Sequence, residues 1–108
     1  MTAARIVTTP YPDTTQRVQL GTSVYSLRIR WNQRGAAWYL DMADSVGNEL
    51  LRGLRLVTLW PLLYRFHYNP AIPAGELYFI DLREEHARPT LEGMGDRFRL
   101  YYLDDGQW

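Results

Sequence analysis

The stretch VYSLRIRW, residues 24–31, decides the fold class, because every second side chain in it is apolar. The apolar set is Tyr25, Leu27, Ile29 and Trp31, and the polar set is Ser26, Arg28 and Arg30. In an extended chain, neighbouring side chains point to opposite faces, so this pattern is typical of an antiparallel strand with one buried face.

Two more strands follow this one. Residues 32–35 (NQRG) predict a hairpin connection, and residues 37–43 alternate again, with Trp38, Leu40 and Met42 opposed to Tyr39 and Asp41. The next turn is DSVGN, residues 44–48, and the third strand covers residues 49–57. In this third strand Leu50, Leu54 and Leu56 share one side, and Gly53 indicates a bulge or a close backbone approach.

Shorter strands are expected over residues 5–8, 17–20, 76–82 and 97–103. The predicted fold is therefore all-β, a small antiparallel sandwich or barrel of six to seven strands. One short helix is expected near residues 62–66, because Pro61 suits a first helical position and Leu62, Leu63 and Phe66 recur at helical spacing. The predicted core includes Leu27, Ile29, Trp38, Leu40, Leu54, Leu56, Leu77 and Leu100.

Length and composition favour one globular β-domain over residues 1–108, with an extended arm and first strand in residues 1–16 and a tail over residues 104–108. Four Trp, eight Tyr and three Phe carry too much apolar area for a disordered chain. The chain reaches Pro10 before the apolar core of a signal peptide develops, and its longest apolar-rich run is shorter than the ~20 residues of a membrane span. We expect a soluble protein without a membrane partner.

The residues that catalysis requires are scarce. Without cysteine there is no disulfide, zinc ribbon or thiol nucleophile, and His67 and His86 lack metal-ligand spacing. The acidic pairs at residues 84–85 and 104–105 are adjacent in sequence, so on an extended chain their side chains diverge. No GxSxG or phosphate-binding glycine motif is present. We expect no enzymatic activity, no metal and no organic cofactor.

Aromatic and arginine residues are the best candidates for contacts. All twelve basic residues are Arg, which reflects either a GC-rich genome or the preference for Arg at protein contacts. Residues 60–68 contain four aromatic residues. This segment is either a loop that covers the core or an exposed contact site. The candidate interface consists of Trp60, Leu62, Leu63, Tyr64, Phe66 and Tyr68, with Arg28 and Arg30 as a second patch. A formal net charge of zero argues against a nucleic-acid partner.

Taken in order, six motifs and one glycine carry a resemblance. They are YSLRIRWN at residues 25–32, AWYLDM at 37–42, Gly47, LRGLRL at 51–56, LLY at 62–64, PAGELY at 73–78 and LEGMGDRFRLYY at 91–102. Together they resemble the small baseplate plug family of contractile-tailed bacteriophages, over residues 18–103. The resemblance implies a structural virion protein at the end of the tail tube, packed against hub, tube and tape-measure proteins, with no catalytic or cofactor site. It also implies a homo-oligomer within a three-fold or six-fold assembly, since such tails have closed rotational symmetry.

A ligand-binding β-barrel for an oligosaccharide or single-stranded nucleic acid is the alternative. A binder of that kind needs a concave groove with convergent polar groups, whereas an assembly protein has broad contact faces.

Overall fold

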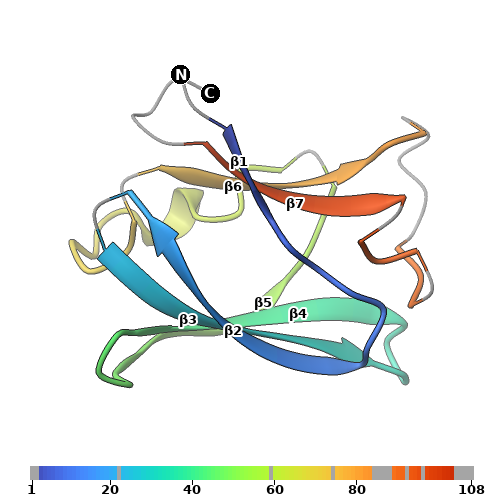
Figure 1. Ribbon diagram of the computed structural model, residues 1–108, viewed down its shortest axis with the longest axis horizontal. Helices are drawn as coiled ribbons and strands as arrows, with labels where there is room; N and C mark the ends of the chain where they lie inside the picture. The colour runs from blue at the N-terminus through green and yellow to red at the C-terminus, as the bar shows by residue number, and fades with distance from the viewer. Residues whose placement is uncertain are drawn as a thin grey trace.

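Two antiparallel sheets face each other in the computed structural model, which describes residues 3–21, 23–58, 60–73, 75–83, 89–91, 93–95 and 97–103 (Figure 1). The strands in these ranges are β1 (Ala3–Ile6), β2 (Asp13–Leu20), β3 (Ser23–Asn32), β4 (Ala37–Asp44), β5 (Glu49–Arg55), β6 (Glu76–Asp81) and β7 (Phe98–Leu103). One sheet has the order β2-β3-β4-β5 and the other the order β1-β7-β6. The predicted all-β class is confirmed.

The alternating residues of β3 and β4 form the inner face of the four-stranded sheet. Leu27 lies opposite Met42 and Ile29 opposite Leu40, and all four side chains are buried. The three-stranded sheet supplies the facing half of the core. Its buried apolar side chains are Ile6, Leu77, Phe79, Phe98, Leu100 and Tyr102.

Gly53 forms a bulge in β5, as its position predicted. Leu40 pairs with Leu54 and Met42 with Leu51, so two steps along β4 match three along β5, and Gly53 has a φ of 70°. The extra residue places Leu51 and Leu54 on the same face of β5, opposite the buried Met42 and Leu40. Leu54, predicted as a core residue, is only partly buried against the core, because β5 is an edge strand of its sheet. Leu50 is also partly buried, whereas Leu51 is buried.

The two sheets are joined along both sides. On one side the Leu56 N–H donates to the Trp38 carbonyl at 3.0 Å, and Thr58 then pairs with Phe79 of β6. On the other side residues 7–12 lead from β1 to β2, and Gln16 Nε2 donates to the Val7 carbonyl at 2.6 Å. The sandwich is thereby closed toward a barrel.

Residues 60–73 form turns where a short helix was expected. The helical geometry is one 3₁₀ turn, η1 (Tyr64–Phe66), in which the Phe66 N–H donates to the Leu63 carbonyl at 2.9 Å. A further turn joins Asn69 N–H to the Phe66 carbonyl at 3.0 Å. Pro70 and Pro73 have no N–H to donate, so an α-helix cannot continue through this stretch.

Two strands are placed differently from their predictions. β1 covers Ala3–Ile6 where residues 5–8 were expected, and β2 begins at Asp13, four residues before the predicted start. Residues 13–16, the part of β2 that was not predicted, are all polar and lie on an edge strand that exposes much of its surface. Without alternating apolar residues, their sequence does not indicate a strand. The paired acids at residues 84–85 and 104–105, together with His86, lie outside the described residues.

Candidate contact surface

The aromatic segment, defined as residues 60–68, is fixed against β6 by its backbone. The Leu62 N–H donates to the Leu77 carbonyl at 3.1 Å, and the Leu63 N–H donates to Oε1 of Glu76. The neighbouring Thr58 forms a parallel bridge with Phe79. The segment is therefore attached to the three-stranded sheet at Leu62 and Leu63.

This attachment divides the segment into buried and exposed side chains. Leu62 and Leu63 are 4% and 0% exposed and belong to the core between the sheets, so their assignment to the contact surface is wrong. Trp60, Tyr64 and Tyr68 are 55%, 67% and 83% exposed. Those three rings form the candidate contact surface, and Phe66 lies at its edge, partly buried against the core.

The exposure of these rings is notable because the protein has a complete core without them. The three rings lie within nine residues of the chain, and clustered exposed apolar groups mark contact sites more often than isolated ones do. Rings held on a fixed backbone also lose little conformational entropy when a partner covers them. Physically, this segment is suited to protein contact.

Glu76 lies beneath the aromatic segment and is fully buried. Its Oε1 also accepts the Leu77 N–H at 3.0 Å, while Oε2 has no hydrogen-bond partner among the described residues. Burial raises the pKa of Glu76, against the opposing effects of the Leu63 and Leu77 N–H groups and of His67. His67 Nε2 lies 2.9 Å from the Gly75 carbonyl oxygen. The buried carboxyl group thus anchors the segment from below.

The second predicted patch, Arg28 and Arg30, lies on the outer face of the four-stranded sheet and is neutralised there. Arg28 binds Asp13 through two hydrogen bonds of 3.0 and 2.6 Å, and Arg30 binds Asp41 through two of 2.9 and 3.1 Å. These hydrogen bonds hold the pKa of both carboxyl groups below their usual value and raise the pKa of both arginines. Both guanidinium groups are therefore already paired within the sheet.

The Asp41 carboxylate also accepts the N–H of Gly53 at 2.8 Å, so the ion pair and the β5 bulge support each other.

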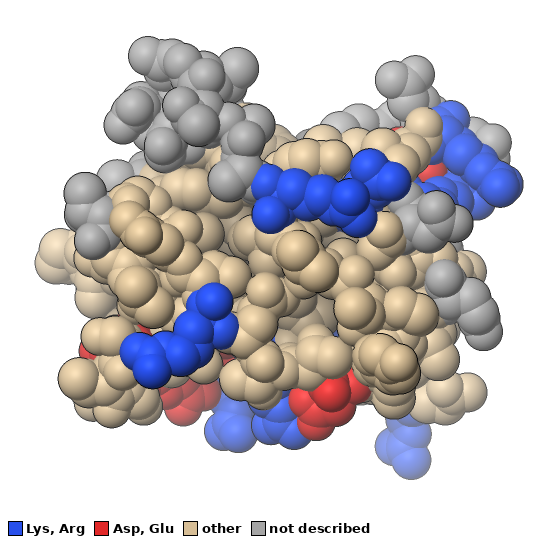
Figure 2. Space-filling model, in the orientation of Figure 1, with Lys and Arg blue, Asp and Glu red and all other residues tan. Residues whose placement is uncertain are grey.

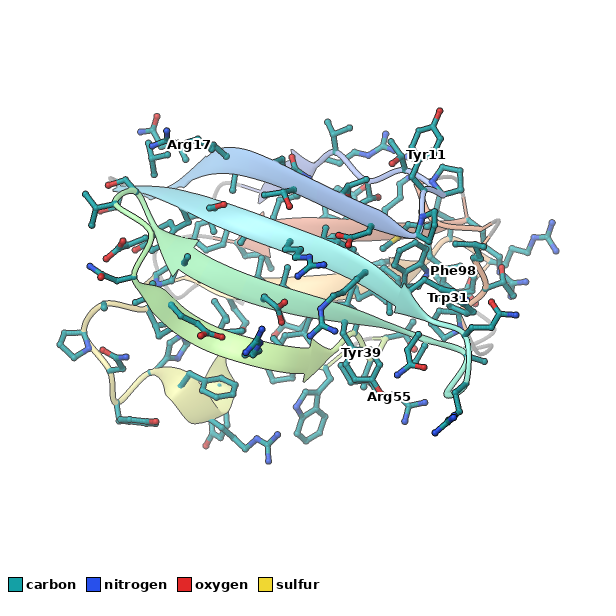
Figure 3. All side chains as sticks on the ribbon, turned by 90° about the horizontal axis from the view of Figure 1, so that it is seen from below. Tyr11, Arg17, Trp31, Tyr39, Arg55 and Phe98 are labelled. Carbon is teal, nitrogen blue, oxygen red and sulfur yellow. The ribbon has the colours of Figure 1, made fainter. Side chains whose placement is uncertain are left out.

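A shallow pocket of about 420 Å³ lies at the end of the same sheet, near Trp31 and Tyr39 (Figure 3). Its lining residues are Pro12, Asp13, Arg30, Trp31, Asn32, Gln33, Arg34 and Tyr39. Several of its polar groups bond within the protein: Gln33 Oε1 accepts the Trp31 indole N–H at 3.1 Å, and Asn32 Oδ1 accepts the Gly35 N–H at 3.1 Å. Asp13 and Arg30 are also engaged, in the ion pairs with Arg28 and Asp41. Few polar groups of the pocket therefore remain to bind a ligand, which gives little support to a binding site for an oligosaccharide or a single-stranded nucleic acid.

The sequence reasoning missed the outer face of the three-stranded sheet. Tyr78 lies opposite Tyr101, and Leu103 follows on the same side of β7; all three are partly exposed. Burial and the charge of Glu76 raise the pKa of Tyr78. The alternation in β7 could have predicted this face, because it places Tyr101 and Leu103 on the side opposite the buried Leu100 and Tyr102.

No group of three or more metal-binding side chains occurs within the described ranges. Nor do these ranges contain a helix long and apolar enough to cross a membrane.

A family model described as "Cyanophage baseplate Pam3 plug gp18" matches residues 3–105, which is nearly the whole chain. No curated protein matches the sequence.

Proposed function

The chain belongs to the family of the cyanophage baseplate plug, and we propose that it plugs or completes the distal end of the tail tube through its aromatic segment. Membership confirms the resemblance found in the sequence and gives the protein a structural role in a phage baseplate, as a component of the virion tail. We further propose that it contacts the hub, tube and tape-measure proteins, and that it is made in the host cytoplasm before it joins the tail.

The observation that carries this proposal is the exposure of Trp60, Tyr64 and Tyr68 on a segment that is fixed to β6. Aromatic side chains at the centre of an interface commonly cost more than about 2 kcal/mol of binding energy when truncated. A plug needs strong contacts from a small protein, and three exposed rings on a rigid base supply them. Arg28 and Arg30 contribute less, because a partner would have to compete with Asp13 and Asp41.

A baseplate role also bears on stoichiometry and chemistry. Tail tubes and hubs have closed rotational symmetry, so we expect a copy number that matches three-fold or six-fold neighbours. The proposed role is purely structural and involves no catalysis.

The double variant Tyr64→Ala, Tyr68→Ala tests the proposal. Both side chains are largely exposed, so the variant should remain folded by circular dichroism and yet be lost from assembled tails. Tyr11→Ala is the matched control, since Tyr11 is 67% exposed, as is Tyr64, but precedes β2 in the sequence.

The control variant should enter tails at the wild-type copy number. A double variant that is also incorporated at that copy number would contradict the proposed contact surface.

A further inference from the structure

Each sheet has two edge strands, and β2 differs from the other three. β1 has only four residues, and two register shifts interrupt the pairing of β5 with β4. The outer edge of β6 is partly covered, since Thr58 forms a bridge with Phe79 and the Leu62 N–H donates to this strand. β2 has eight residues without proline, glycine or a register shift, and no described strand pairs with its outer side (Figure 3). It is therefore the edge best suited to pairing with another strand.

The backbone groups at the open edge of β2 follow from its pairing with β3. The Trp31 N–H donates to the Pro12 carbonyl at 2.7 Å, in the register that continues through both strands. Hydrogen-bonded pairs alternate along an antiparallel ladder, so every second residue from Pro12 bonds to β3. The residues between them direct their N–H and C=O groups to the open edge, and their side chains are all exposed: Asp13, Thr15, Arg17 and Gln19.

The two charged residues of β2 make this edge complementary to itself. If a second copy of β2 pairs antiparallel with the first and the two Thr15 residues face each other, Asp13 of each copy lies opposite Arg17 of the other. Opposite charges and threonine pairs directly across two strands are both stabilising. A pair centred on Asp13 or on Arg17 would bring like charges together instead. The charges therefore select one register.

Both charged side chains can reach a second copy. Arg28 binds the Asp13 carboxylate, but this side chain is 50% exposed and each of its oxygens can accept a further hydrogen bond. Arg17 makes one long hydrogen bond, of 3.4 Å to the Ser45 carbonyl, and no ion pair with any residue in the described ranges.

The charges around this edge are mixed. In Figure 2 acidic and basic side chains both lie along the lower layer, which is the four-stranded sheet. A second copy, which has the same mixture, suits such a surface better than a partner whose charges are all of one sign.

We propose that two copies of the free protein pair through β2, antiparallel and centred on Thr15, so that their four-stranded sheets join into one continuous sheet. About six backbone hydrogen bonds would form between the two strands. In strand addition the main-chain hydrogen bonds supply the affinity, and the side chains supply the specificity. The pair would also cover an edge that is otherwise open to aggregation.

Pairing through β2 goes beyond the proposed function and does not involve the aromatic segment, which is attached to the other sheet. The pair has two-fold symmetry, whereas three-fold or six-fold symmetry is expected for the tail. It therefore belongs to the free protein and has to separate before the chain enters a tail.

Sedimentation of the purified protein over a concentration series tests the pairing. The wild type should show a reversible equilibrium between monomer and dimer. Arg17→Asp and Asp13→Arg each place like charges opposite one another, and each should raise the Kd of the dimer at least about tenfold. Arg55→Asp is the matched control and should leave the Kd unchanged, because Arg55 is an exposed arginine on β5, the other edge strand of the same sheet.

An equal mixture of the Arg17→Asp and Asp13→Arg variants tests the register. In a mixed pair, position 13 of each copy carries the charge opposite to that of position 17 facing it. The mixture should therefore dimerise at concentrations at which each variant alone is monomeric.

Thr15→Pro tests the backbone pairing, because it removes an N–H group at the open edge, where the strand can tolerate proline. Thr15→Val keeps this N–H group and should still dimerise. Circular dichroism checks the fold of both variants, and the charge variants decide the matter if Thr15→Pro does not fold.

The inference is overturned if the wild type stays monomeric, if Arg17→Asp and Arg55→Asp weaken the dimer equally, or if the mixture stays monomeric. The Tyr64→Ala, Tyr68→Ala variant should dimerise like the wild type, and its failure to do so would show that the copies meet through the aromatic segment. Arg17→Asp should still enter tails. Its loss from tails would contradict the assignment of the pair to the free protein.

Discussion

The hydroxyl group of Tyr102 accepts a hydrogen bond of 2.9 Å from the backbone N–H of Gly75. The contact joins the end of β7 to the residue before β6, directly beside the buried Glu76. A Cβ atom at Gly75 would lie 2.5 Å from Cζ of Tyr102 and would overlap the Leu103 carbonyl. This position therefore has no room for any side chain.

Gly75→Ala should destabilise the protein by about 3 kcal/mol or more, because backbone of β7 would have to move. The measurement is the free energy of unfolding in urea. Gly47→Ala serves as the control: it has a φ of 94° but no neighbour within 4 Å, so only backbone strain of about 1 kcal/mol is expected. Equal losses in the two variants would show that β6 and β7 are not packed this closely.

Glu76 should make stability depend on pH. Its pKa in the folded protein is raised above the ordinary value of 4.5, so its contribution is fully present below pH 4.5 and is lost as the pH rises through the folded-state pKa. The charge of His67 acts against this rise in the pKa of Glu76, and the charge of Glu76 in turn raises the pKa of Tyr78.

Glu76→Gln removes this titration, so the wild type should lose stability relative to the variant as the pH rises through that window. Urea unfolding across the pH range measures the difference, and Glu49→Gln, at an exposed site, should follow the wild type. If the difference in free energy of unfolding between the wild type and Glu76→Gln stays constant with pH, the pKa of Glu76 is not raised.

The buried ion pair should matter far more than the exposed one. Arg97 binds Asp81 at 2.8 Å, and the Asp81 side chain is 2% exposed, whereas the Asp13 side chain that binds Arg28 is 50% exposed. Arg97→Met removes the charged partner of a buried carboxylate and should cost about 3–5 kcal/mol. Arg28→Met should cost far less, because solvent screens that exposed pair. Thermal and urea unfolding of both variants would detect the difference, and similar losses would show that the Asp81 carboxylate reaches solvent.

Truncation of Leu40 tests the inner face of the four-stranded sheet. Leu40→Ala should cost about 2–5 kcal/mol, because its side chain is fully buried opposite Ile29. Val24→Ala, at an exposed position of β3, should change the free energy of unfolding by less than about 0.5 kcal/mol. If Leu40→Ala is as mild as the control, the two sheets do not pack through this layer.

Three strands, β3, β4 and β7, could be predicted because each contains enough alternating apolar residues to reveal its buried face. β6 could be predicted from its high content of β-forming residues. The start of β2 could not, since residues 13–16 are polar on both faces of an edge strand. Gly53 revealed the bulge, but the resulting change of side for Leu51 depends on the register with β4, which no local pattern contains.

The contact surface could be predicted only in part from the sequence, as the aromatic segment shows. Composition identified residues 60–68, but the exposure of each side chain depends on the pairing of this segment with β6. Leu62 and Leu63 point between the sheets for that reason, and the sequence alone placed them on the surface. The outer face of β6 and β7 was missed because its tyrosines become neighbours only through pairing across strands.

The strand order has a consequence for synthesis on the ribosome. The β2-β3-β4-β5 sheet consists of consecutive strands and can pair as the chain emerges, whereas β7, which follows the other described strands in the sequence, is the central strand of the β1-β7-β6 sheet. In a nascent or truncated chain without β7, β1 and β6 lack the strand that both of them pair with, so the three-stranded sheet cannot form. Translation through β7 is therefore needed to complete the sheet to which the aromatic segment is attached, and a chain that stops before β7 should not enter particles.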